Sequence, residues 1–306
     1  MVIRIGTCSW TDHHPFYPLA LEKRERRGEQ LGYYAQFFSV VEIDSTYYHL
    51  QPVRNFRRWA SASPDDFVFN VKAYGELTWH HRSSDRQQML PRAETHAQFR
   101  ESLQPLREAN KLGAVMFQFA PWFVWGETQR AYLMRLREFY PQDRITIEFR
   151  HRSWYSPDVW VEVQELLREL EYSYVIVDEP QIGEACAPPF ISVTAEDLAV
   201  FRFHGRNRAT WYLKGKASPG DRFNYLYSPE ELREWITPID QVAHDVREVH
   251  ALFNNNHANY AVVNAFNLAH LLKLPVPDPP PGVAEVIGYQ GGGARPSTWA
   301  NSPLID

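Results

Sequence analysis

Residues 144–150 read Arg-Ile-Thr-Ile-Glu-Phe-Arg, an alternation of apolar and polar side chains. Successive side chains of a β-strand point to opposite faces of its sheet. The two isoleucines and Phe149 would therefore share one face, and Glu148 and Arg150 would share the other. A parallel sheet covered by helices on both faces is expected to be apolar on both. This stretch thus predicts a strand with one apolar face and one polar face.

Seven other short runs, rich in β-branched or aromatic residues, also predict strands. They occupy residues 3–8, 40–44, 67–72, 114–119, 173–178, 199–204 and 248–254. Amphipathic helical patterns separate them, most clearly from Val159 to Leu170 behind Ser156-Pro157. The segment 228–231, Ser-Pro-Glu-Glu, predicts a capping box at the start of another helix. The sixth crossover, 179–198, contains three prolines and leaves room for only a short helix.

Strands that alternate with helices indicate a parallel sheet, and eight such units can close into a barrel. An open doubly wound sheet is the alternative, but the Gly-rich phosphate turn that usually follows one of its early strands is absent from this sequence. A barrel also explains the two unlike faces, because helices cover the outside while the polar face looks inward. The predicted fold is therefore α/β, a single (β/α)₈ TIM-type barrel over residues 1–274.

Residues 275–306 form a Pro/Gly-rich C-terminal extension beyond that barrel. Val286, Ile287, Tyr289 and Trp299 are apolar for a free tail, so we expect the extension to pack on the barrel.

Composition narrows the classes of function. The net charge of −5 argues against a broadly basic surface for nucleic acid, although a local positive cleft remains compatible with it. Cys8 and Cys186 lack C-x-x-C spacing, which argues against a thiolate zinc site or a disulfide framework. The first residues lack a signal-peptide pattern, and no apolar run is long enough to span a membrane. We therefore expect a cytoplasmic protein; the sequence leaves its oligomeric state open.

Active sites of such barrels lie at the C-terminal ends of the strands. Face parity and strand order predict an inward-facing polar set there, with Glu42 and Asn70 one layer deeper: Asp44, Lys72, Gln118, Glu148, Arg150, Asp178, Arg202, His204 and Asn254.

Three of these residues are candidates for catalysis, namely Glu148, Asp178 and His204. Two carboxylates on adjacent strands are suited to acid–base chemistry or glycoside cleavage, and a histidine to proton transfer. The alternative is that Glu148 joins ion pairs which hold a polar core together, and that His204 is structural.

The remaining candidates are predicted to bind substrate: Asp44, Lys72, Gln118, Arg150, Arg202, Asn254, Trp10 and Tyr47. The cations Lys72, Arg150 and Arg202 could bind a phosphate or carboxylate group of the substrate, and they could also neutralise nearby acidic side chains. The two aromatic residues could stack on a sugar or base, or pack at the rim. No cofactor is identified and no metal ligand is assigned, although the oxygen and nitrogen donors leave a divalent metal open.

At these residues the chain resembles the domain-of-unknown-function-72, or YecE-like, family of TIM-barrel proteins. The resemblance covers residues 3 to about 272 and implies the barrel and a shared pocket, but no reaction, cofactor or substrate. Residues 79–81, Trp-His-His, match a Thr-His segment of that family ambiguously, so no role passes to His80. The matching segments are 5–10, 16–18, 41–48, 67–72, 117–121, 148–154, 203–206 and 253–255 with Ala261, Asn264 and Ala265.

Three functions fit this pattern. The first is a hydrolase or lyase that acts on a phosphate-bearing or other anionic substrate, with a nucleotide or nucleic acid as one form of it. The second is a glycoside- or sugar-transforming enzyme that uses Glu148 and Asp178. The third is a non-catalytic protein that binds a small anion. The cations on the third, fifth and seventh strands favour the first.

Overall fold

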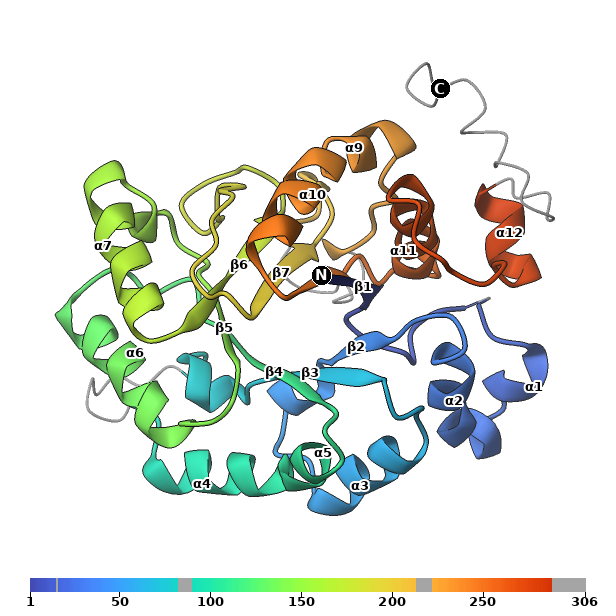
Figure 1. The fold of residues 1–306 in the computed structure, drawn as a ribbon, viewed down its shortest axis with the longest axis horizontal. Coiled ribbons are helices and arrows are strands. Elements are labelled where there is room, and N and C mark those ends of the chain that lie inside the picture. Colours follow the sequence, from blue (N-terminus) through green and yellow to red (C-terminus); the bar gives the residue numbers. More distant parts are fainter. Residues whose placement is uncertain (15, 82–89, 213–221, 288–306) are drawn as a thin grey trace.

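The computed structural model describes residues 1–14, 16–81, 90–212 and 222–287. Eight parallel strands pair in chain order and close on themselves, because β1 pairs with both β2 and β8 (Figure 1). The strands are β1 Val2–Thr7, β2 Val40–Ile43, β3 Val68–Lys72, β4 Leu112–Gln118, β5 Ile145–Glu148, β6 Tyr172–Asp178, β7 Leu198–Phe203 and β8 Glu248–Phe253. Each overlaps a predicted strand with ends shifted by at most two residues, and the predicted barrel is confirmed.

Helices surround the strands on the outside (Figure 1). They are α1 Leu19–Glu22, α2 Gln30–Tyr34, α3 Val53–Ser61, α4 Ala93–Ser102, α5 Gln104–Glu108, α6 Glu127–Phe139, α7 Pro157–Glu169, α9 Pro229–Arg233, α10 Ile236–Asp245, α11 Tyr260–Leu271 and α12 Pro281–Ile287. Short 3₁₀ turns cover Arg24–Glu29, Ser45–Tyr47, Gly75–Thr78 and Arg152–Trp154. The predicted capping box at Ser228 is present. The Ser228 side chain accepts from the backbone N–H of Glu231, and the Glu231 side chain accepts from the backbone N–H of Ser228.

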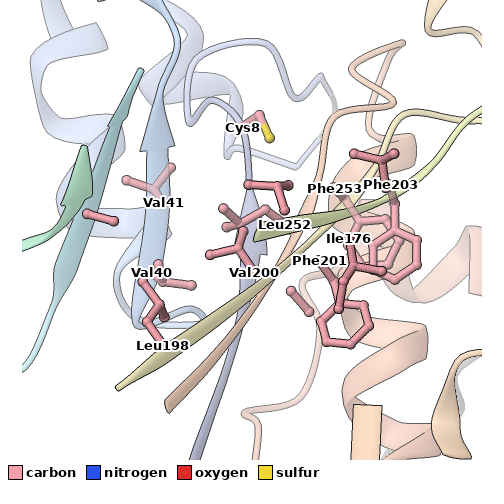
Figure 2. Packing of buried hydrophobic residues seen from close by; sticks show 14 of the residues in the cluster. Cys8, Val40, Val41, Ile176, Leu198, Val200, Phe201, Phe203, Leu252 and Phe253 are labelled. Atoms are coloured by element: carbon pink, nitrogen blue, oxygen red, sulfur yellow. The ribbon is translucent and has the colours of Figure 1, made fainter. Parts of the chain in front are cut away.

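The two faces of the strands divide the core. Figure 2 shows Phe201, Phe203 and Phe253 gathered on one side of β7 and β8, toward the helices, while Val200 and Leu252 lie on the other. All five side chains are buried. The inner side thus begins apolar and becomes polar toward the strand ends, where Arg202 and His204 follow Val200 on the same face.

Two features of the strands affect the site. Gly6 permits the contact of β1 with β2, because a Cβ at this position would lie 2.1 Å from the Val40 carbonyl oxygen. That contact is short, since only Gly6 and Thr7 pair with β2, opposite Val40 and Val41. The two strands therefore separate above Thr7, at the end of the barrel where the polar residues lie.

The sixth crossover, residues 179–197, forms no helix, in keeping with its prolines. The start of the C-terminal extension packs on the barrel: Val283 and Ile287 of α12 are buried, and Asn259 donates to the Gly282 carbonyl. Val286, expected to pack, is 46% exposed; Tyr289 and Trp299 lie outside the described residues. No helix in the described ranges has the length and apolar character needed to cross a membrane.

Candidate active site

The centre of the polar interior is the buried Glu148 carboxylate at the end of β5. Gln118 Nε2 donates to it at 2.6 Å, Arg202 Nη1 at 2.5 Å and Arg150 Nη1 at 3.2 Å, and His204 Nε2 lies at 3.1 Å. Burial alone would raise the pKa of Glu148, but the Arg202 charge and the hydrogen bond with His204 outweigh it and hold the pKa well below its ordinary value. Glu148 is thus a fixed anion that organises side chains from the ends of β4, β5 and β7.

Arg202 joins this carboxylate to a second one. Its Nη2 donates to Glu42 Oε1 at 2.6 Å, and all three side chains are fully buried. Burial of such a group is tolerated only when it is paired, and here one guanidinium spans two carboxyl groups.

His204 has both ring nitrogens engaged. Asn254 Nδ2 lies 2.9 Å from Nδ1, while Nε2 faces Glu148. This arrangement fits a neutral ring that accepts at Nδ1 and donates at Nε2. Burial lowers the pKa of His204 to about 4, in agreement with a neutral ring. His204 and Asn254 therefore orient Glu148, and neither ring nitrogen is left over for a substrate.

Glu42 behaves differently from Glu148. Burial raises its pKa to about 8, Arg202 opposes the rise, and the neighbouring Asp44 carboxylate adds to it. Asp44 has a lowered pKa because Lys72 and Arg202 outweigh its burial. Near neutral pH the pair thus consists of a protonated Glu42 and an ionised Asp44, and the Glu42 hydroxyl can donate to its neighbour.

Two cations reach the mouth of the barrel at the ends of β3 and β5. Lys72 Nζ lies 3.3 Å from Asp44 Oδ1 and 5.1 Å from the centre of the Tyr47 ring. Arg150 contacts Glu148 and places Nη2 2.9 Å from Glu179 Oε2, and its guanidinium lies over Trp211. Their side chains are 11% and 13% exposed, unlike the enclosed Arg202.

Two residues at the mouth were not assigned from the sequence. Arg222 is exposed, but partial desolvation and the nearby Arg150 charge lower its pKa. His80 lies 4.9 Å from the Tyr47 ring, and burial, Lys72 and Arg150 lower its pKa to about 3. Neither residue lies on a strand, so strand parity gives no signal for them. The mouth thus holds Lys72, Arg150 and a neutral histidine, with the Arg222 charge near that of Arg150.

The expected position of Asp178 is wrong. Its register partner on β7 is Phe203, which faces the helices, so Asp178 points out of the barrel. There it binds Arg206 and accepts from Trp235 Nε1 at 3.1 Å. Glu179 occupies the inner face instead, against Arg150. Burial raises the pKa of Glu179 to about 7.

Glu148 and Asp178 therefore lie on opposite faces of the barrel wall and cannot act as a pair on one glycosidic bond. The other expected residues do come together: Gln118, Arg150, Arg202 and His204 meet at Glu148, and Asn254 meets His204. Asp44, Lys72 and Tyr47 form a neighbouring group, and Asn70, in the deeper layer, lies 3.1 Å from His250 Nδ1. Trp10 lies near the end of β1 and packs edge-on against Trp59.

No group of three or more His, Cys, Asp or Glu side chains within the described ranges is arranged to hold a metal ion. The inner carboxylates are instead engaged by arginine, lysine and glutamine.

The fold and this pocket define a TIM-barrel protein with a polar, cation-bearing site at the C-terminal strand ends. Residues 4–284 match the family model described as protein of unknown function DUF72, and the chain belongs to this family. The resemblance deduced from the sequence is thereby confirmed.

Similar proteins share nearly the whole barrel. The UPF0759 protein YunF of Bacillus subtilis is 33% identical over 278 residues, which are 89% of this chain and 95% of that protein. A DUF72 family protein of Enterococcus faecalis is 31% identical, with a TM-score of 0.78 over 92% of this chain and 98% of its own. A DUF72 family protein of Thermotoga maritima is 30% identical, with a TM-score of 0.73 over 89% of this chain and 100% of its own.

Proposed function

We propose that this protein is an enzyme, a hydrolase or lyase, that acts on a phosphate-bearing small molecule at the mouth of the barrel. The observation that supports this most is the group of three cations, Lys72, Arg150 and Arg222. Partial burial and, after it, the nearby Arg150 charge lower the pKa of Arg222. A multiply charged anion placed between like charges would relieve their repulsion and bind by charge-assisted hydrogen bonds.

The residues behind the mouth supply the chemistry in this proposal. Glu42 carries a proton near neutral pH and is suited to act as a general acid toward a leaving group. Asp44 stays ionised beside it, and Lys72 links that pair to the bound anion. The positioning residues are those whose side chains hydrogen-bond at Glu148, namely Gln118, Arg202 and His204, together with Glu148 itself. Glycoside cleavage by Glu148 and Asp178 is not proposed.

Binding of inorganic phosphate, measured by calorimetry, tests the proposed phosphate site at the mouth of the barrel. Arg222 is exposed and is not part of the inner network, so Arg222→Gln should fold normally. One charge-assisted hydrogen bond contributes about 1.5–3 kcal/mol, so affinity should fall roughly 10- to 100-fold. Arg130→Gln is the matched control, since Arg130 lies on the outer helix α6, 3.6 Å from Glu162.

Turnover of phosphate esters tests the proposed catalytic activity. Phosphomonoesters and phosphodiesters would be incubated with the protein, and products would be followed by phosphate release and mass spectrometry. Turnover that is lost in Glu42→Gln supports the proposal. Absence of phosphate binding, or equal losses in Arg222→Gln and Arg130→Gln, would overturn the site. Tight binding without turnover of any ester would leave a non-catalytic anion-binding protein.

A further inference from the structure

A cavity of about 400 Å³ lies where β1 and β2 separate, and the proposed phosphate site does not account for it. This β1–β2 pocket is lined from the strand ends and from helix α3, by Ser9, Trp10, Thr11, Glu42, Asp44 and Trp59 among others. Its size lies within the range of small-molecule sites, roughly 300–1,000 Å³. The pocket thus extends from the outer helices to two carboxyl groups of the active site.

One side of the pocket is aromatic and rigid. The Trp10 and Trp59 rings meet edge to face with centres 5.4 Å apart, and Phe56 supports Trp59 at 5.1 Å. Trp10 and Trp59 remain 9% and 8% exposed. Packed indole rings offer an apolar surface against which the C–H face of a flat or cyclic ligand can lie.

The other side is rich in oxygen. Glu42 is fully buried; its Oε1 accepts from Arg202, and its carboxyl group also hydrogen-bonds to Asp44. Ser9 Oγ and Thr11 Oγ1, which lie 3.2 Å apart, add hydroxyl groups at the end of β1. A protonated and an ionised carboxyl group with two hydroxyls can both donate to and accept from the same ligand. Sugar hydroxyls have this dual character.

We propose that the β1–β2 pocket binds the ring of a sugar phosphate whose phosphate group lies on the cations of the mouth. The inference rests on the proposed function and names its substrate class. Asp44 connects the two regions, because it lines the pocket and also lies 3.3 Å from Lys72 Nζ. A ring whose hydroxyls reach Glu42 and Asp44 therefore places an attached phosphate next to Lys72.

Gly28 allows the pocket to be blocked without disturbing the core. It lines the cavity, and a Cβ added at Gly28 meets no atom within 4 Å. Gly28→Phe adds a large ring at this lining position, whereas Gly28→Ala adds only a methyl group and serves as its control. Trp59→Leu removes one aromatic wall and gives a second, independent change.

The experiment compares inorganic phosphate, ribose 5-phosphate and glucose 6-phosphate by calorimetry on the full chain. Wild type should bind at least one sugar phosphate about tenfold or more tightly than phosphate. Gly28→Phe should lose that advantage while keeping its phosphate affinity, and Gly28→Ala should keep both. Trp59→Leu should reduce the advantage, and free ribose should show saturation transfer in NMR that Gly28→Phe abolishes.

Equal affinity for phosphate and both sugar phosphates would overturn the sugar subsite while leaving the phosphate site intact. An advantage that persists in Gly28→Phe would also overturn it. If phosphate itself fails to bind, the proposed function is wrong. The saturation-transfer signal of free ribose then tests the sugar subsite by itself. A ribose signal sensitive to Gly28→Phe then supports the subsite, and its absence refutes it.

Discussion

Replacement of Glu42 by glutamine tests the claim that this buried carboxyl carries a proton near neutral pH. The pKa of Glu42 is raised from 4.5 to about 8. Between these values the folded protein binds a proton that the unfolded chain has released, so wild-type stability falls as pH rises. A shift of one pKa unit changes the free energy of unfolding by about 1.4 kcal/mol, so the full shift corresponds to roughly 4–5 kcal/mol. Below pH 4.5 the contribution is fully present, and above pH 8 it is lost.

Glutamine keeps an oxygen that can accept from Arg202 but does not titrate. The free energy of unfolding of Glu42→Gln, relative to wild type, should therefore rise by up to about 1.4 kcal/mol per pH unit between pH 5 and 8. The difference between the two proteins is measured because buried histidines and Glu179 change the absolute values in both alike. Denaturant unfolding at several pH values gives this difference. A difference that is independent of pH, or that falls as pH rises, would show an ionised Glu42 and refute the reasoning.

Three other changes have distinct expected outcomes. Arg202→Met leaves two buried carboxyl groups without their shared cation, so denaturant unfolding should show a loss of about 3–5 kcal/mol; a loss under 1 kcal/mol would contradict the described network. Gly6→Ala places a Cβ 2.1 Å from the Val40 carbonyl oxygen, so it should lower the melting temperature strongly, whereas a wild-type melt would disprove that close contact. Asp178→Asn weakens the pairing with Arg206 outside the barrel, so it should reduce stability yet leave phosphate affinity within about twofold; a tenfold loss in calorimetry would place Asp178 in the site after all.

Strand parity predicted most of the pocket because the relevant strands have unlike faces. Lys72, Glu148 and Arg202 each alternate with apolar neighbours, so their direction could be inferred from the sequence. Strand β6 gave no such signal: all seven of its residues are buried, and both faces are largely apolar. The last polar residue of that run, Asp178, was therefore placed inward, whereas the pairing with β7 directs Glu179 there instead.

Other parts of the site depend on three-dimensional proximity that no pattern contains. Arg222 and His80 lie outside the strands, and only the closed barrel brings them near Arg150. The different protonation of Glu42 and Glu148 arises from the distribution of donors. Glu148 receives four, while Glu42 receives Arg202 and faces another carboxylate. The β1–β2 pocket likewise depends on where the pairing of two strands ends.

The location of a bound anion tests the central claim most directly. Crystals grown without phosphate or sulfate would be soaked in tungstate, a phosphate-like anion whose heavy atom gives a strong anomalous signal. We predict one dominant site at the mouth, within hydrogen-bond distance of Lys72, Arg150 and Arg222. The opposite end of the barrel offers a rival cavity lined by Arg137, Arg144, Arg168 and Arg247. Tungstate bound only there, or at neither end, would contradict the account.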